Sequence, residues 1–253
     1  MVVGINKFRE HFAGHEDQYA IIGGAACELI FGAAGVAFRA TKDIDMVLCV
    51  EAVDAAFGKS FSAFLAAGGY EARERGGAGR KEFHRFSGPS DKTFPHMIEL
   101  FSRKPEALTL PETAHLTPID VEDDVVSLSA ILLDDIYYEA LCAARREIEG
   151  VTILDETLLI PFKAKAFLDL TARKGAGEMI DSGDIKKHRN DVFRLLQLLP
   201  GDASIDVPTP LRSDLNAFVE AVGNDVSLDP KSFDVPLTRE DAVSLIRSAY
   251  RLR

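Results

Sequence analysis

The sequence predicts an α+β fold, with a mixed sheet and flanking helices followed by a C-terminal helical domain. Short apolar runs rich in β-branched residues alternate with helical apolar spacing up to about residue 155. Beyond about Thr157, helical spacing continues without strand-like runs. The length of 253 residues suits one large domain or two small ones. We therefore expect an α/β domain over residues 1–155 and a helical domain over residues 156–253.

The first third of the α/β domain has a compact strand–helix–strand pattern. A short leading helix is predicted over Ile5–His11, followed by a buried strand over Tyr19–Ile22. Gly23-Gly24 comes next and leads into helical spacing over Ala25–Phe31. A polar turn then precedes a second strand, which opens with Asp-Ile-Asp and runs over Asp43–Val50.

The next elements are a helix, a hairpin and a single strand. Phenylalanines at helical spacing predict a helix over Val53–Ala67, which Gly68-Gly69 ends. Two strands, Tyr70–Arg75 and Lys81–Phe86, are joined by a glycine-rich segment that we interpret as a hairpin turn. Pro95–Phe101 is the following strand, in which one acid stands among apolar residues.

The rest of the first domain gives weaker patterns. Residues 104–124 hold three prolines and several acids and are expected to be mainly loop. Val125–Leu133 is apolar and fits either a strand or a buried segment. Asp134-Asp135 is a plausible N-cap for a helix that runs to about Arg146, and Val151–Leu154 is a short last strand.

The second domain is predicted to consist of helices. Their expected ranges are Pro161–Arg173, Asp184–Leu199, Pro210–Val222 and Thr238–Leu252. Pro161 suits the first position of a helix, because the amide hydrogen that proline lacks has no intrahelical partner there.

Composition narrows the possible classes of protein. Apolar residues make up 47% of the chain without an apolar run of the ~20 residues that a membrane helix needs, so we expect a globular protein with no membrane partner. Three scattered cysteines and a first segment without signal-peptide layout favour a reduced, cytoplasmic location. The net charge of −11 argues against broad attraction to nucleic acid. Two local basic groups, around residues 73–85 and 186–189, fit either a solvated face or a nucleic-acid surface.

Two carboxylates at the start of the second strand carry the main functional signal. Asp43 and Asp45 project from one face of that strand, because side chains alternate along it. Mg²⁺ is commonly held by one or two carboxylates together with substrate phosphates, and Mn²⁺ can take its place. Gly23 and Gly24 remove two Cβ atoms where a helix begins, so phosphate oxygens can approach the backbone amides there. The combination predicts a nucleotide site, and the alternative is a strand-edge turn with solvated carboxylates.

These residues resemble a known family. Gly-Gly and the Arg-x-Thr-x-Asp-x-Asp of residues 39–45, within a strand–helix–strand unit, are similar to the polymerase-β-like nucleotidyltransferase superfamily. Within it they look most like the AbiEii-type branch, which includes toxins of type IV toxin–antitoxin pairs. The resemblance implies that residues 1–155 form the nucleotidyltransferase-fold catalytic domain. It also implies Mg²⁺-dependent transfer of a nucleoside monophosphate from an NTP to an acceptor hydroxyl, for which tRNA is a candidate, and an antitoxin protein as a candidate partner.

The resemblance also implies roles for individual residues in the first domain. Asp43 and Asp45 would ligate metal, and Glu99 in Ile-Glu-Leu would be the third acid of a two-metal site, where it could also position or deprotonate the attacking hydroxyl. The alternative for Glu99 is a solvent-facing side chain on a one-sided sheet. Gly23 and Gly24 would bind phosphate oxygens, with help from Thr41 and Arg39.

A lysine and an acid in the second domain complete the expected site. On a helical wheel with Phe162 at zero, Lys163 falls at about 100°, inside the apolar stripe, and Lys165 at about 300°, outside it. The resemblance implies that Lys163 neutralises triphosphate charge, with Lys165 as the fallback. The alternative for Lys163 is snorkelling to water.

The following helix holds the last expected site residue and a departure from the family. The resemblance places one acid at position 188, where this chain has His188, and a second at Asp191, which is retained. The alternative for Asp191 is a surface pair with Lys187, one helical turn away. Two functions from different classes follow from these residues. One is a nucleotidyltransferase, for which the resemblance implies a toxin role. The other is a catalytically inactive module on the same fold that binds a nucleotide or a protein partner.

Overall fold

The protein is described from a computed structural model that covers residues 2–49, 52–74, 83–101, 117–118, 131 and 134–252. The chain divides into two compact units. The first consists of Met1–Val121 and Arg145–Asp155, and the second of Glu122–Ala144 and Glu156–Arg253. The division after Asp155 falls where the sequence pattern changes, but residues 122–144 group with the second unit and not with the first.

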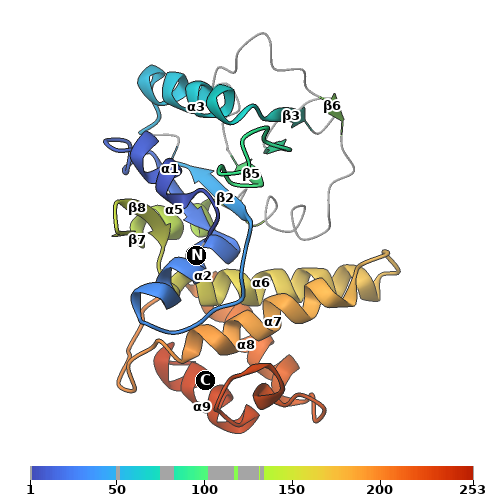
Figure 1. Ribbon diagram of the computed structural model, residues 1–253. Helices are drawn as coiled ribbons and strands as arrows, with labels where there is room; N and C mark the ends of the chain where they lie inside the picture. Colours follow the sequence, from blue (N-terminus) through green and yellow to red (C-terminus); the bar gives the residue numbers. More distant parts are fainter. Residues whose placement is uncertain are drawn as a thin grey trace. The chain divides into compact units, whose positions relative to one another are not determined.

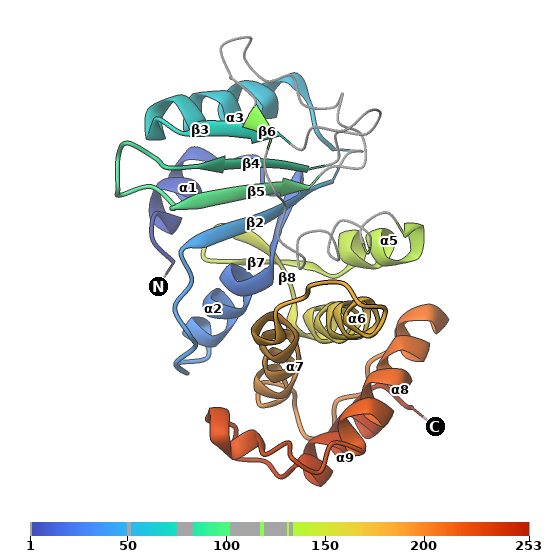
Figure 2. The ribbon, with the colours of Figure 1, turned by 90° about the vertical axis from the view of Figure 1, so that its right-hand side faces the viewer.

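The first unit is built on a mixed sheet, which agrees with the predicted fold class. Its strands lie in the order β6-β3-β4-β5-β2-β1-β8-β7, and Figure 2 shows β3, β4, β5 and β2 side by side. Their bounds are Tyr19–Ile22 (β1), Asp43–Leu48 (β2), Glu71–Glu74 (β3), Phe83–Ser87 (β4), Met97–Phe101 (β5), Thr117–Pro118 (β6), Arg145–Ile148 (β7) and Val151–Leu154 (β8). The β2–β5 and β1–β8 pairs are parallel, whereas β1–β2, β4–β5 and β7–β8 are antiparallel.

Three described helices accompany this sheet: α1 over Ile5–His11, α2 over Gly23–Ala33 and α3 over Ala55–Gly68 (Figure 1). The aromatic side chains of α1 and α3 pack on one another, with the ring centroids of Phe8 and Phe64 5.8 Å apart. Local chemistry sets the ends of α3. The Asp54 carboxylate accepts a hydrogen bond from the Phe57 amide, and Gly69 ends the helix in the left-handed conformation at φ 63°.

The second unit is helical in its described part. Its helices are α5 over Asp135–Ala143, α6 over Glu156–Gly175, α7 over Ser182–Leu196, α8 over Thr209–Gly223, the 3₁₀ helix η2 over Pro230–Phe233 and α9 over Arg239–Ala249 (Figure 1). Aromatic contacts join four of them: Phe218 of α8 lies against Phe167 of α6 and Phe193 of α7, and Phe193 lies against Phe233 of η2. Among the described helices, none combines the length and apolar character needed to cross a membrane.

Most predicted elements are confirmed to within a few residues, and two predictions are wrong. The helix expected to reach Arg146 ends at Ala143, and Arg145 already begins β7. Pro161 does not start a helix, because α6 begins at Glu156 and contains it. The expected hairpin turn at 76–79 and most of the segment 104–133 lie outside the described residues.

A hydrogen bond explains how α6 tolerates an internal proline. Pro161 has no amide hydrogen, so the carbonyl of Thr157, four residues earlier, lacks its helical donor. The Tyr250 hydroxyl donates to that carbonyl oxygen at 2.8 Å. Tyr250, the C-cap residue of α9, therefore replaces the missing helical hydrogen bond.

Replacing Tyr250 with phenylalanine is expected to lower the free energy of unfolding by about 1–3 kcal/mol, because the partly buried hydrogen bond from the Tyr250 hydroxyl to the Thr157 carbonyl is lost. Urea denaturation of the purified chain measures this. In a Pro161→Ala background the alanine amide supplies the missing hydrogen bond, so there the same exchange should cost much less. An equal cost in both backgrounds would contradict the explanation.

Candidate functional site

Three charged side chains form a row across neighbouring strands of the first unit. Asp45 of β2 is paired with Glu99 of β5, and Glu99 is paired in turn with Arg85 of β4. Residues directly paired in a sheet share a face, so the aspartate pair and Glu99 lie on the same side. Glu99 is only 5% exposed, which excludes the alternative of a solvent-facing glutamate.

The Gly-Gly turn brings the backbone against this row. Strand β1 passes directly into α2 at Gly23, which has φ +67°, a conformation that favours glycine. A Cβ at Gly23 would lie 1.9 Å from Oδ2 of Asp45. A Cβ at Gly24 would lie 3.2 Å from Oγ1 of Thr41 and 3.4 Å from Nη2 of Arg39. The first turn of α2 is therefore in close contact with Asp45, Thr41 and Arg39.

The start of α2 has the properties of an anion-binding helix end. Its N-cap is Ile22, which makes no side-chain capping bond. The first amides of a helix lack intrahelical acceptors, and the helix dipole makes this end positive. Because Gly23 and Gly24 carry no side chains, an anion can approach these amides closely.

Glu28 is a site-forming residue that the sequence analysis did not identify. Its carboxylate oxygen Oε2 accepts a hydrogen bond from the Thr41 amide at 3.1 Å. It thereby ties the middle of α2 to the segment that carries Arg39 and Thr41. Next to Thr41, the Arg39 guanidinium lies 5.3 Å from the Phe38 ring, which packs on Phe31. In the sequence, Glu28 could have been identified as the one acidic residue within the otherwise apolar segment Gly23–Ala33.

Arg85 holds Glu99 through short contacts. Nε of Arg85 donates to Oε1 of Glu99 at 2.8 Å, and Nη2 of Arg85 lies 2.5 Å from the same oxygen. Burial, and next the negative charge of Asp45, raise the pKa of Glu99 to about 9, while Arg85 opposes this rise.

Asp43 is partly open to solvent. Its side chain is 38% exposed, and Nδ1 of His96 lies 3.6 Å from Oδ1 of Asp43, too far for a hydrogen bond. That Oδ1 is itself buried and accepts no hydrogen bond. A carboxylate oxygen in this condition suits a cation.

The three acids expected to bind metal differ in their surroundings. Within the described ranges, no group of three or more His, Cys, Asp or Glu side chains is arranged to hold a metal ion. Asp43 and Asp45 fit Mg²⁺ or Mn²⁺ when substrate phosphates supply further oxygens. Glu99 fits less well as a ligand, because its oxygen Oε1 is engaged by two nitrogens of Arg85.

In the second unit, the structure brings Lys163 and Asp191 together. Lys163 of α6 and Asp191 of α7 are 5% and 0% exposed, and Nζ of Lys163 lies 3.2 Å from Oδ2 of Asp191. Arg194 contacts the other carboxylate oxygen of Asp191, also at 3.2 Å. Lys163 thus meets a partner in the interior and does not snorkel. His188, at the position where the family has an acid, is buried on the same helix α7.

Lys165 has a different environment, as its place on the helical wheel predicts. Its side chain is 36% exposed, and Nζ lies 3.1 Å from Oδ2 of Asp214 on α8. The same carboxylate accepts a hydrogen bond from the Tyr137 hydroxyl of α5 at 2.8 Å. Lys165 therefore links α6 to α8, and this position does not favour it as the fallback for Lys163.

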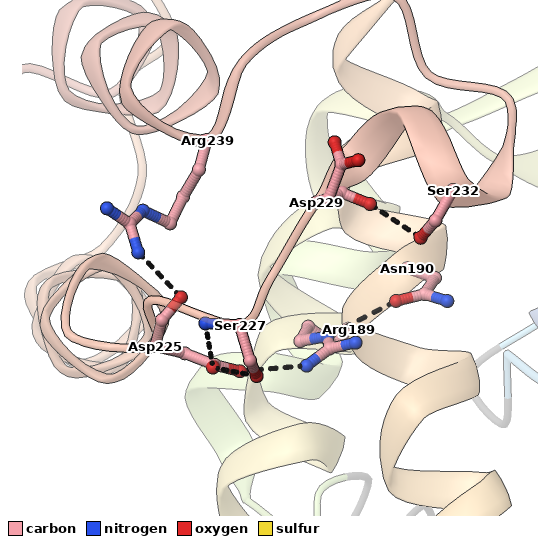
Figure 3. Close-up of polar contacts among 7 residues, drawn as sticks. All are labelled: Arg189, Asn190, Asp225, Ser227, Asp229, Ser232 and Arg239. Carbon is pink, nitrogen blue, oxygen red and sulfur yellow. Dashed lines mark hydrogen bonds and ion pairs between the residues drawn. The ribbon is translucent and has the colours of Figure 1, made fainter.

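A second polar cluster of this unit involves the basic group around residues 186–189 (Figure 3). Arg189 contacts Oδ2 of Asp225 at 3.2 Å, and Arg239 donates to the Asp225 carbonyl at 2.6 Å. Ser227 donates to Oδ1 of Asp225 from both its amide and its hydroxyl. Burial lowers the pKa of Arg189, and Asp225 opposes that change. Arg189 thus fastens α7 to the segment after α8 and does not belong to a solvated basic face.

Comparison with models of known protein families finds no match to this chain, and comparison with curated proteins finds none either. The functional assignment therefore depends on the residues and geometry described above.

Proposed function

We propose that this chain is a Mg²⁺-dependent nucleotidyltransferase. It would move a nucleoside monophosphate from an NTP to an acceptor hydroxyl, with RNA, including tRNA, as the candidate acceptor. The observation that supports this best is the contact of Gly23 with Asp45, which sets an uncapped, side-chain-free helix start directly against a carboxylate pair. Phosphates bind at such a helix start, and a divalent cation binds at such a pair.

Each residue of the first unit has a role in this proposal. Gly23 and Gly24 present amides to phosphate oxygens, while Thr41 and Arg39 contact phosphates from the other side. Asp43 and Asp45 hold the cation, which when bound neutralises the charge that develops on the phosphate oxygens. The oxygen of the acceptor hydroxyl attacks the α-phosphorus and releases its proton to water. The bond from the α-phosphorus to the oxygen that bridges to the β-phosphorus breaks, and pyrophosphate leaves.

Glu99 and the lysines receive narrower roles than the resemblance implies. Glu99 is enclosed by Arg85 and Asp45, so we propose that it positions Asp45 and is not the base for the acceptor hydroxyl. Lys163 and Asp191 form a buried pair within the second unit. We therefore assign this pair a structural role between α6 and α7.

The test is incubation of the full chain with Mg²⁺, each α-labelled NTP and total RNA. We expect labelled RNA with the native chain and none with Asp43→Ala. The matched control is Asp91→Ala, which removes an exposed carboxylate of the same unit that pairs with Lys7, and it should retain transfer. Loss of label with the control as well would remove the support for a specific role of Asp43.

The competing function is a module that binds nucleotide without turnover. It is favoured by two observations: His188 occupies the family's acidic position, and Glu99 is held by Arg85. NTP binding at micromolar concentration, with no transfer to any RNA tried, would support this alternative over the transferase.

Glu28 provides a prediction that separates binding from turnover. Glu28→Ala is expected to raise the KM for NTP about tenfold with little change in kcat, because the Thr41 segment loses its anchor on α2. Glu28→Gln keeps an oxygen acceptor for the Thr41 amide and should restore most of the affinity. Steady-state kinetics of both variants measure this, and an equal defect in both would contradict the hydrogen-bond explanation.

A toxin role predicts a cellular result. Expression of the chain without any neighbouring gene should arrest growth if it acts as the toxin of a toxin–antitoxin pair, and Asp45→Ala should relieve the arrest. Normal growth at high levels of folded native protein would count against the toxin role and against an antitoxin partner, while leaving the transferase activity open to the assay above.

A further inference from the structure

The contact between Arg85 and Glu99 bears on how many metal ions the proposed site can hold. In the two-metal arrangement, a third carboxylate beside the aspartate pair shares in binding a second cation. Here that carboxylate belongs to Glu99, and two nitrogens of Arg85 lie 2.5 Å and 2.8 Å from one of its oxygens. Both side chains are buried, so water does not readily loosen the pair.

A second divalent cation near Glu99 would meet a fixed positive charge. The register puts Arg85, Glu99 and Asp45 in consecutive positions across three strands, and the guanidinium lies against the Glu99 carboxylate. Like charges repel strongly where burial lowers the effective dielectric constant. A cation ligated by Glu99 would also have to compete with a charge-assisted hydrogen bond.

At Oδ1 of Asp43, a cation would not have to displace an arginine that is already bound to its ligand. Asp43 is partly open to solvent, and its buried Oδ1 accepts no hydrogen bond. Oδ2 of Asp45 faces the backbone of Gly23. A single cation bound by these two aspartates and by phosphate oxygens has the oxygen ligands that Mg²⁺ prefers.

We infer that the site holds one divalent cation, on Asp43 and Asp45, and that the Arg85 guanidinium binds Glu99, the third acid, in place of a second ion. This inference rests on the proposed function. Arg85 is thus a positioning residue: it acts through Glu99 and touches neither the nucleotide nor the acceptor.

The test counts bound Mn²⁺ in the full chain by electron paramagnetic resonance, with an α,β-non-hydrolysable NTP analogue at a concentration equal to that of the protein. The native chain is expected to bind one Mn²⁺. Glu99→Gln, which can still accept a hydrogen bond from Arg85, should also bind one, with its Kd changed by less than about threefold because Glu99 is not a ligand. Arg85→Met frees Glu99 and should bind two.

The control is Arg9→Met, which removes an exposed ion pair with Glu149 in the same unit and should leave one Mn²⁺ bound. Two Mn²⁺ in the native chain would overturn the inference, as would a loss of affinity of about tenfold or more in Glu99→Gln. A folded Arg85→Met variant that still binds one Mn²⁺ would show that Arg85 is not what limits the site to one cation. If Arg85→Met does not fold, the native count and Glu99→Gln still decide the question.

The outcomes also separate this inference from the proposed function. Two Mn²⁺ together with intact transfer of label to RNA would overturn only the single-cation site. No bound Mn²⁺ and no transfer would overturn both.

Discussion

Replacing Asp191 with alanine is expected to lower the free energy of unfolding of the helical unit by about 3–5 kcal/mol. The carboxylate is fully buried, and without it the equally buried Lys163 keeps a positive charge with no Asp191 opposite it. Removing one partner of a buried pair costs more than removing both, because the remaining charge must be desolvated alone. Urea denaturation measures the loss, and hydrogen exchange in α6 and α7 assigns it to this unit.

Two control variants make this prediction specific. Lys163→Met combined with Asp191→Leu removes both charges and should recover most of the lost stability. Lys165→Met breaks a pair with Asp214 that is partly open to solvent, and it should cost only about 0–1 kcal/mol. If Asp191→Ala were no more costly than Lys165→Met, the buried pair would not be a main stabilising contact of α6 and α7.

Replacing Asp45 with asparagine is expected to lower kcat/KM for nucleotidyl transfer about 10³-fold without destabilising the fold. The shape of the side chain beside Gly23 is kept, but the negative charge that would hold the cation is lost. The same charge opposes ionisation of Glu99, so its removal relieves repulsion inside the unit. We expect thermal stability equal to or above that of the native chain, because residues kept for function often lower the stability of the fold.

The matched control for this exchange is Asp91→Asn. Asp91 is an exposed acid of the same unit that pairs with Lys7, so its exchange should leave kcat/KM within about twofold. An Asp45→Asn chain that unfolds, or one that retains full activity, would each contradict the role assigned to Asp45.

The local part of the site could be predicted from sequence. The β1–Gly-Gly–α2 connection and the start of β2 follow from glycine position and from the switch between strand and helix spacing. The inward place of Lys163 follows from helical periodicity, since its position relative to Phe162 determines the face. These signals operate within about twenty residues and need no knowledge of strand pairing.

The contacts of Arg85 could not be predicted in the same way. In the sequence it stands with other basic residues, which suggested a solvated or nucleic-acid-binding face. Its partner Glu99 is brought beside it only by the register between β4 and β5, and register depends on the whole sheet. Likewise, Tyr250 compensates for Pro161 from the opposite end of the unit's chain, so the proline alone suggested a helix start.

The most direct measurement of the central claim compares an NTP labelled on the α-phosphate with one labelled on the γ-phosphate, each incubated with the full chain, Mg²⁺ and total RNA. The carboxylate pair and the Gly-Gly turn, acting as a nucleotidyl-transfer site, predict α-label on RNA, γ-label in released pyrophosphate, and neither product with Asp45→Asn. Label from the γ-phosphate on RNA, or transfer that persists in Asp45→Asn, would contradict it.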